Sequence, residues 1–198
     1  MSSIVLASAS KIRSDILNNA GVRHRCETAT IDETIIKNRV RQEDGSVETA
    51  ATALADAKAE NVAARIPQAL VIGADQILEC EDRWFDKPPD MAAAAETLKA
   101  LRGRRHRLIS AVSVYRDEIN VWRHLEIPHL TMRDFSDRFL KNYLQEADPD
   151  ILKSVGAYRM EGTGAQLFSH IDGDYFTILG LPLLALLDFL RKVGVVAE

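Results

Sequence analysis

Four charged side chains on separate segments of the 198-residue chain have the types needed for phosphate and metal chemistry. Glu33 and Asp75 are carboxylates, the kind of oxygen ligand that Mg²⁺ prefers. Lys58 and Lys87 are amines that can neutralise phosphate oxygens as charge develops on them. We predict these four as catalytic residues, with Asp75 and Glu33 as metal ligands. Taken singly, each has the alternative interpretation of a solvated surface residue.

Asp75 has the most informative position of the four. The apolar run 69–72 breaks at Gly73-Ala74-Asp75, which is typical of a buried strand that ends on a polar residue. Ligands of open α/β sheets bind at the carboxyl ends of strands. The pattern therefore favours a site residue over surface decoration.

A serine-rich turn near the start is a second candidate site. Ser8, Ser10, Lys11 and Arg13 lie where a short apolar run passes into a helical pattern. The unpaired N–H groups and the dipole of a helix N-terminus favour an anion there. We predict phosphate binding by Ser8, Ser10 and Arg13; the alternative is that Ser10 only caps a surface helix.

Glycines surround a third candidate near the carboxyl end. They lie in the segments 156–162, 172–175 and 180–182, and they permit tight turns or close backbone approach. Glu161, between these elements, is placed to read a base edge; the alternative is a set of ordinary turns. The five histidines show no HxxxH or HExxH spacing, which disfavours a zinc hydrolase, and we expect His106 to be a structural hydrogen bonder.

The elements that must position these residues alternate along the chain. Apolar periodicity and caps predict helices at 12–20, 48–65, 91–101, 136–146 and 183–193. Short apolar or alternating runs predict strands at 4–7, 24–31, 69–72, 107–115 and 119–132, with a hairpin near Trp84. We interpret the polar stretch 32–45 as a site-bearing loop. The order predicts an α/β fold.

Composition narrows the class of protein further. With 46% apolar residues, the chain can build one substantial core, so we predict a single domain over 1–198. The net charge of −4, with both signs interspersed, argues against a nucleic-acid partner. We expect the isolated Cys26 and Cys80 to be buried, reduced thiols. No signal peptide is indicated, and the apolar stretch 178–190 is too short to span a bilayer, so we expect a cytoplasmic protein without a membrane partner.

The separate motifs occur in an order that resembles the Maf family of nucleotide pyrophosphatases. The ordered set covers nearly the whole chain, and it is far more specific than any single motif. Its members are Leu6-Ala7-Ser8-Ala9-Ser10 with Arg13, Asp32-Glu33, Lys58, Gly73-Ala74-Asp75, Lys87-Pro88, Gly103-Arg104 with His106, Gly156-Ala157-Tyr158, Gly162, Gly173-Asp174-Tyr175 and Gly180-Leu181-Pro182.

The resemblance implies an elongated, inosine triphosphatase-like α/β fold, with a mixed central sheet flanked by helices and two lobes around a cleft. It implies hydrolysis of a nucleoside triphosphate between the α and β phosphates, with a divalent cation, Mg²⁺ or else Mn²⁺. Asp75 falls on the family's catalytic acid, Glu33 joins it at the metal, and Lys58 and Lys87 fall on active-site lysines. Family members often form homodimers.

Three positions bear on the choice of base. Gln76 and Glu161 resemble the branch that acts on 7-methyl-GTP, because the dTTP and UTP branch typically has threonine and glutamine there. A carboxylate at Glu161 can accept hydrogen bonds from guanine N1–H and the exocyclic amine, and it complements the positive charge of a 7-methylated base. Ile12 departs from that branch, which often has tryptophan at this position.

Two alternatives to a 7-methyl-GTP pyrophosphatase stay open at this point. One is an enzyme of the same family that prefers dTTP or UTP. The other is a non-catalytic regulator of septum formation, the cellular role from which the family takes its name. The intact set Glu33, Lys58, Asp75 and Lys87 argues against this second alternative.

Overall fold

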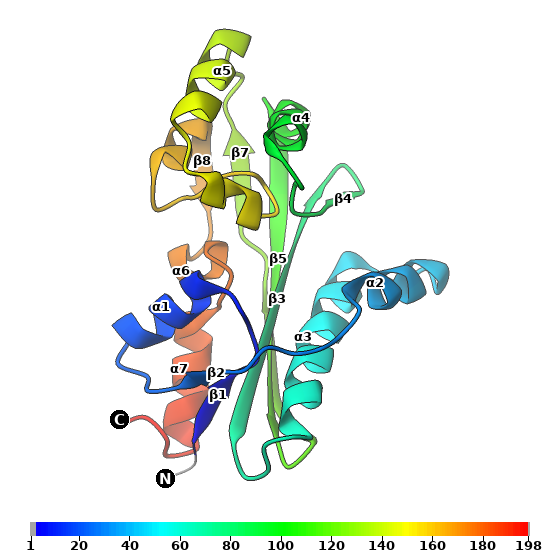
Figure 1. Cartoon of the computed structure of the whole chain (residues 1–198), viewed down its shortest axis with the longest axis vertical. Coiled ribbons are helices and arrows are strands. Elements are labelled where there is room, and N and C mark those ends of the chain that lie inside the picture. Colours follow the sequence, from blue (N-terminus) through cyan, green and yellow to red (C-terminus); the bar gives the residue numbers. More distant parts are fainter. Residues whose placement is uncertain (1–2, 198) are drawn as a thin grey trace. The chain divides into compact units, whose positions relative to one another are not determined.

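The computed structural model describes residues 3–197 and confirms the expected α/β fold with a mixed sheet flanked by helices (Figure 1). Within these residues, eight strands form one open sheet in the order β2-β1-β3-β5-β7-β8, with β4 paired to β3 and β6 paired to β5. The strands are β1 (Ile4–Leu6), β2 (Arg25–Cys26), β3 (Leu70–Cys80), β4 (Arg83–Phe85), β5 (Arg105–Arg116), β6 (Ile119–Glu126), β7 (His129–Met132) and β8 (Phe168–Asp172). The α-helices are α1 (Lys11–Asn19), α2 (Glu33–Gln42), α3 (Val47–Ala63), α4 (Met91–Leu101), α5 (Asp137–Glu146), α6 (Tyr175–Ile178) and α7 (Leu183–Lys192), and the 3₁₀ helices are η1 (Pro149–Lys153) and η2 (Thr163–Leu167).

Both strand directions occur in the sheet. Strand β1 pairs in parallel with β2 and β3, as expected where helices connect successive strands. The pairs β3–β4, β5–β6, β5–β7 and β7–β8 are antiparallel. The sheet is therefore parallel on both sides of β1 and antiparallel at these four pairs.

The chain divides into two compact units. The first contains residues up to Gln76, Ser110–Glu126 and the residues from Tyr175 onward; the second contains Ile77–Ile109 and Ile127–Asp174. Strands β3 and β5 contribute residues to both units.

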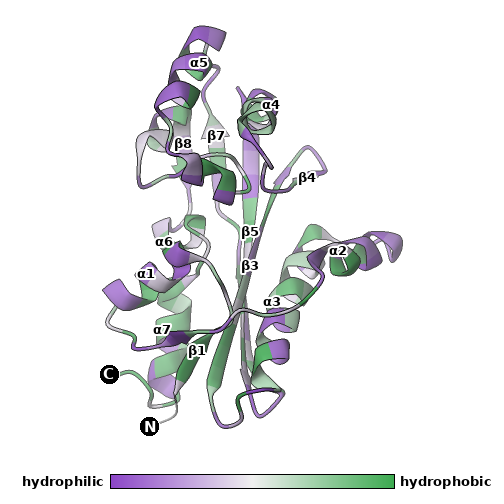
Figure 2. Cartoon of the chain, viewed as in Figure 1, coloured by the Kyte–Doolittle hydropathy of each residue, from purple (hydrophilic) through white to green (hydrophobic). Residues whose placement is uncertain are grey.

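The first unit has a hydrophobic layer on each face of its strands. Alternate residues of β1 point to opposite faces. Ile4 and Leu6 pack in one cluster with side chains of α1 and α7, while Val5 packs in another with side chains of α3. Hydrophobic residues accordingly follow β1 and α7 in Figure 2. The helices thus cover both faces, which explains why β1 is entirely apolar.

The second unit is built around a buried aromatic cluster. Tyr158 packs edge-on against Phe168 with ring centroids 4.8 Å apart, and its hydroxyl lies 3.0 Å from Nε2 of His106. His106 is only 2% exposed. The expectation that His106 is a structural hydrogen bonder is therefore confirmed. Helix α5, by contrast, is largely hydrophilic (Figure 2) and buries only Leu140 and Tyr143.

Three predicted strands differ from the structure, one of which is β3, the strand that carries Asp75. The strand expected over 24–31 has only two residues, Arg25 and Cys26, both exposed. The strand expected over 119–132 is two strands, because Ile127-Pro128 interrupts it: proline has no N–H to donate and restricts the residue before it. Between β5 and β6 the chain turns at Asp117 and Glu118, which have φ of 50° and 63°.

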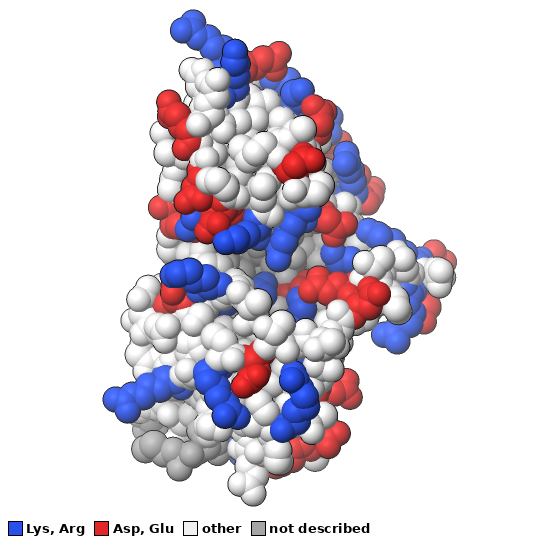
Figure 3. Space-filling model, in the orientation of Figure 1, with Lys and Arg blue, Asp and Glu red and all other residues white. Residues whose placement is uncertain are grey.

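The surface charges and the exposure of the two cysteines can be compared with the expectations from composition. Basic and acidic side chains are interspersed on the face shown in Figure 3. Both cysteines are free thiols. Cys80 is buried as expected, but Cys26 is exposed, as is the other residue of the short strand β2. Among the described residues, no helix is both long and apolar enough to cross a membrane.

Candidate active site

A cluster of ion pairs in the first unit joins three of the four predicted catalytic residues. The Nζ atom of Lys58 lies 2.5 Å from Oδ1 of Asp75 and 2.7 Å from Oε1 of Glu33. Only 12% of the Lys58 side chain and 9% of the Asp75 side chain are exposed, against 48% for Glu33. Two carboxylates from different elements therefore converge on one ammonium group, with the Glu33 side open to solvent.

Close packing of α3 on β3 brings Lys58 to Asp75. A Cβ atom at Gly73 would lie 2.2 Å from the carbonyl oxygen of Ala55 and 2.7 Å from the amide nitrogen of Ala59. Only glycine permits this approach, and the small, fully buried Ala55 and Ala59 form the facing side of the helix. Lys58 lies on the same helix, and Asp75 lies two residues after Gly73, on the same face of the strand.

The predicted loop over 32–45 is wrong, because most of it is helix α2. Asp32 caps the helix: its Oδ1 accepts hydrogen bonds from the amides of Thr34 and Ile35, at 2.9 Å and 3.1 Å. Glu33 is the first helical residue, where the helix dipole favours a carboxylate. The helix buries only Val40, so its sequence carries almost no apolar periodicity. Glu33 is thus held by a capped helix rather than a flexible loop.

The predicted end of the strand at Asp75 is also wrong. Strand β3 continues without a break to Cys80, so Asp75 lies near its middle. Gly73 interrupts the apolar run for packing reasons, not because the strand stops there. Asp75 is only 6% exposed, so it is a buried acid rather than a surface residue.

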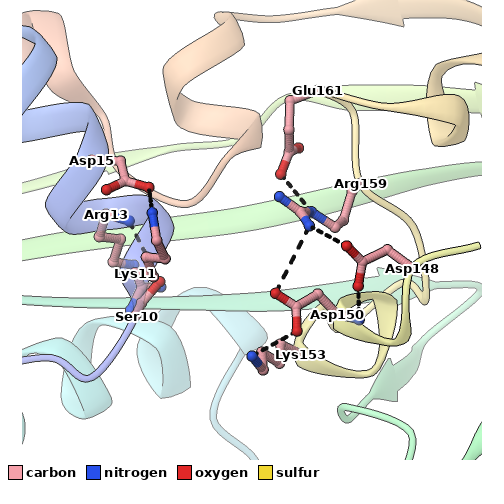
Figure 4. A network of polar contacts seen from close by, with 9 residues as sticks. All are labelled: Ser10, Lys11, Arg13, Asp15, Asp148, Asp150, Lys153, Arg159 and Glu161. Atoms are coloured by element: carbon pink, nitrogen blue, oxygen red, sulfur yellow. Dashed lines mark hydrogen bonds and ion pairs between the residues drawn. The ribbon is translucent and has the colours of Figure 1, made fainter.

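The serine turn is tied to the strand that carries Asp75. Ser8 Oγ accepts a hydrogen bond from the amide of Ser10. Ser10 caps α1, because its side chain accepts a hydrogen bond from the amide of Arg13 (Figure 4). Arg13 donates from Nη1 to the carbonyl of Ala74 and from Nε to the carbonyl of Gly180, both at 2.8 Å. Burial lowers the pKa of Arg13, and the charges of Asp75 and Glu33 oppose that shift. The turn, Arg13 and the carboxylates therefore belong to one electrostatic environment.

Two predicted specificity residues also lie in the first unit. Ile12 is partly buried and packs against the hydrophobic cluster of α1 and α7, so it supports the core from its edge. Gln76 Nε2 donates to Ser110 Oγ at 2.7 Å and to the carbonyl oxygens of Thr177 and Ile178 at 3.0 Å and 3.2 Å. The amide group of Gln76 therefore connects strands β3 and β5 to helix α6.

The remaining candidates, Lys87 and Glu161, lie in the second unit. Lys87 is exposed and follows β4. Glu161 Oε1 accepts a hydrogen bond from Nε of Arg159 at 2.7 Å (Figure 4). The roles of Lys87 and Glu161 remain predictions.

The carboxylate pair fits the oxygen chemistry of a divalent cation. Asp75 and Glu33 already enclose a positive group, the Lys58 ammonium. Over residues 3–197, no group of three or more His, Cys, Asp or Glu side chains could hold a metal ion. A Mg²⁺ ion at this pair would therefore take further oxygens from water or phosphate, as this ion commonly does.

Two residues that hold predicted site residues, Thr177 and Arg159, could not be recognised in the sequence. Thr177 is fully buried; its Oγ1 donates to Glu126 Oε2 at 2.5 Å, while its carbonyl accepts from Gln76 and Ser110. Arg159, which pairs with Glu161, lies in the glycine-containing segment 156–162. No local pattern marks either residue, because their partners are remote in sequence or depend on the turn geometry.

Comparison with known proteins now decides the family. A family model described as "Maf-like protein" matches residues 3–193. The chain belongs to the Maf family. The membership expected from the ordered motifs is thus confirmed.

Named relatives of this Maf protein cover almost its whole length. A protein of Paramagnetospirillum magneticum named "Nucleoside triphosphate pyrophosphatase" is 50% identical over 190 residues, which is 96% of this chain and 98% of the relative. A protein of Rhizobium etli named "7-methyl-GTP pyrophosphatase" is 45% identical over 193 residues, 98% of this chain and 97% of the relative. A protein of Brucella abortus with that same name is 47% identical over 189 residues, 96% and 95% of the two chains. All three names describe hydrolases of nucleoside triphosphates.

Proposed function

We propose that this Maf protein is a nucleoside triphosphate pyrophosphatase. In the reaction, a water oxygen bonds to the α phosphorus, the bond from that phosphorus to the bridging oxygen breaks, and the nucleoside monophosphate and pyrophosphate leave. The observation that carries the proposal is the convergence of Lys58 with Asp75 and Glu33, beside a helix N-terminus held by Arg13. The names of relatives at 45–50% identity support the same reaction.

The candidate residues have two kinds of role in this reaction, proton transfer and charge stabilisation. Asp75 is largely buried and accepts a hydrogen bond from Lys58, so it is oriented to take the proton of the attacking water. The serine turn offers backbone amides and the α1 dipole to a phosphate. Lys58, Lys87 and the remaining N–H groups of Arg13 counter the phosphate charge, since positioning and electrostatics dominate this chemistry.

We further propose that Asp75 and Glu33 hold Mg²⁺ when substrate binds. A cation bound there would neutralise phosphate charge and lower the pKa of a bound water. Lys58, which lies between the two carboxylates, is then free to turn its ammonium group toward a phosphate oxygen. Its long side chain permits this movement without a change in the helix.

For the base, we propose 7-methylguanine. The support is the residue pair Gln76 and Glu161, and in particular the carboxylate of Glu161, which can accept two hydrogen bonds from the purine edge. Residue 12 is an isoleucine, which has no aromatic ring, so stacking at residue 12 is not part of this proposal. The alternative within the family is a preference for dTTP or UTP.

Pyrophosphate release with Mg²⁺, measured across 7-methyl-GTP, GTP, dTTP, UTP and CTP, tests the proposal. We expect the highest kcat/KM with 7-methyl-GTP. The Asp75→Asn protein should release pyrophosphate only at a small residual rate. A preference for dTTP or UTP would keep the reaction and refute the base assignment. No release from any nucleotide would refute the reaction and favour the non-catalytic regulator.

We also propose a cytoplasmic location. Cys26 is an exposed free thiol and Cys80 is a buried one, which suits a reducing compartment. Homodimer formation, expected from the family resemblance, stays a prediction that sedimentation equilibrium can test.

A further inference from the structure

Arg159 and Glu161 form an ion pair within one short turn of the second unit. Arg159 Nε lies 2.7 Å from Oε1 of Glu161. Among the described residues, the other oxygen, Oε2, has no hydrogen-bond donor, and 25% of the Glu161 side chain is exposed. One oxygen is therefore held by the arginine, and the other is available to an outside donor.

The backbone around the pair is fixed on both sides. The amide of Gly162 donates to the carbonyl of Arg159 at 3.3 Å and closes the turn. A Cβ atom at Gly164 would lie 2.4 Å from that same carbonyl oxygen, so η2 packs directly against the turn. On the other side, Tyr158 is buried in the aromatic cluster and bonded to His106. The backbone that carries Arg159 and Glu161 is therefore held in one conformation by its neighbours.

The charge of Arg159 is balanced by a second set of carboxylates. Its Nη1 lies 3.6 Å from Oδ2 of Asp148 and 3.9 Å from Oδ2 of Asp150, and Asp150 also pairs with Lys153 at 2.6 Å (Figure 4). Of these five groups, three are acidic and two are basic, so together they carry a net negative charge although Glu161 is paired. Without the two aspartates, Arg159 would cancel the charge that Glu161 presents.

We propose that Arg159 is a positioning residue for base selection: it fixes the Glu161 carboxylate with Oε2 outward, while Asp148 and Asp150 keep the cluster negative toward a cationic purine. This inference rests on the proposed pyrophosphatase function. A carboxylate oxygen has two acceptor sites, so Oε1 can serve Arg159 and a purine N–H together. Hydrogen bonds to charged groups depend strongly on such geometry.

A double-mutant cycle in the full-length protein tests the proposal. KM and kcat are measured with 7-methyl-GTP, GTP and UTP for wild type, Arg159→Gln, Glu161→Gln and the double variant. Arg159→Gln should raise KM for 7-methyl-GTP roughly tenfold, the effect expected for a hydrogen bond to a charged group, and leave kcat and the UTP reaction nearly unchanged. In the Glu161→Gln background, Arg159→Gln should cause no further rise in KM for 7-methyl-GTP. Arg159→Lys should restore most of the loss, because an ammonium group can still pair with Glu161.

Each outcome decides between the two proposals. Equal losses from Arg159→Gln in both backgrounds, or with all three nucleotides, would make Arg159 merely structural and overturn the inference. Unchanged selectivity in Glu161→Gln would overturn it too while leaving the pyrophosphatase intact. No pyrophosphate release by wild type would remove both proposals. If Arg159→Gln does not fold, the Asp148→Asn and Asp150→Asn double variant carries the test: its preference for 7-methyl-GTP over GTP should fall, and an unchanged preference would refute the charge balance.

Discussion

Replacing Gly73 by alanine should separate α3 from β3 and thereby disturb the Lys58–Asp75 contact. The new Cβ atom would lie 2.2 Å from the Ala55 carbonyl oxygen, and ordinary van der Waals contact begins at 3.4 Å. Relief requires a shift of about 1 Å between the helix and the strand, because a close-packed interior has no space to absorb the methyl group. Lys58 moves with the helix, whereas Asp75 stays with the strand.

Two magnitudes follow from this shift. Overpacking of a core typically costs about 1–3 kcal/mol, which lowers Tm by roughly 2–12 °C in a chain of this length. A misplacement of about 1 Å among catalytic groups can reduce the rate on the order of 10²-fold. The loss of rate should therefore exceed what a modest loss of stability explains.

Thermal unfolding and pyrophosphate release, measured on the same preparations well below Tm, check this prediction. Gly21→Ala is the matched control, because Gly21 has φ of +73° but nothing within 4 Å of an added Cβ. It should lose stability through backbone strain and keep its kcat. A Gly73→Ala protein with wild-type Tm and wild-type rate would refute the packing argument.

Three further predictions concern single groups. Asp75→Asn should lower kcat by about 10² to 10⁴, the range for loss of acid–base help, and full activity would remove Asp75 from the reaction. Burial lowers the pKa of His106 to about 4. Because this folded-state value lies below the unfolded one near 6.5, its contribution to stability is complete above about pH 6.5 and is lost as pH falls toward 4, by about 3 kcal/mol. The free energy of unfolding should thus fall less steeply over that window in His106→Gln than in wild type; parallel curves would contradict this. A thiol reagent should modify Cys26 alone in the native protein and both cysteines after unfolding, and rapid native labelling of Cys80 would contradict its burial.

Most regular elements could be predicted from local signals. Helices α1, α3, α4, α5 and α7 have side-chain caps or apolar periodicity that can be recognised in the sequence, and their observed ends fall within a few residues of the predicted ones. Gly21 and Gly103, which follow α1 and α4 closely, have positive φ of 73° and 71°, the conformation in which glycine commonly ends helices. These features depend on residues close together in the chain, which is why the sequence reveals them.

The two errors near the site have one cause. Helix α2 buries a single residue, so its stability comes from the Asp32 cap and from packing against α3. Its sequence therefore has no apolar periodicity that would predict a helix. In strand β3, Gly73 resembles the end of a strand in the sequence, but its role in the structure is to permit the close approach of α3. In both places a neighbour distant in sequence determines what the local residues do.

The sequence by itself determined the family, the α/β class and the identity of the candidate residues, because residue types and their order are properties of the chain. Only the tertiary structure decided which of them meet. It brought Glu33 and Asp75 to Lys58, bonded the Gln76 amide to α6, and packed Ile12 against the core. It also paired Glu161 with Arg159, which itself contacts Asp150 of η1 and the capping residue Asp148. Such contacts depend on packing distances between separate elements, such as the close approach at Gly73, and no local pattern encodes them.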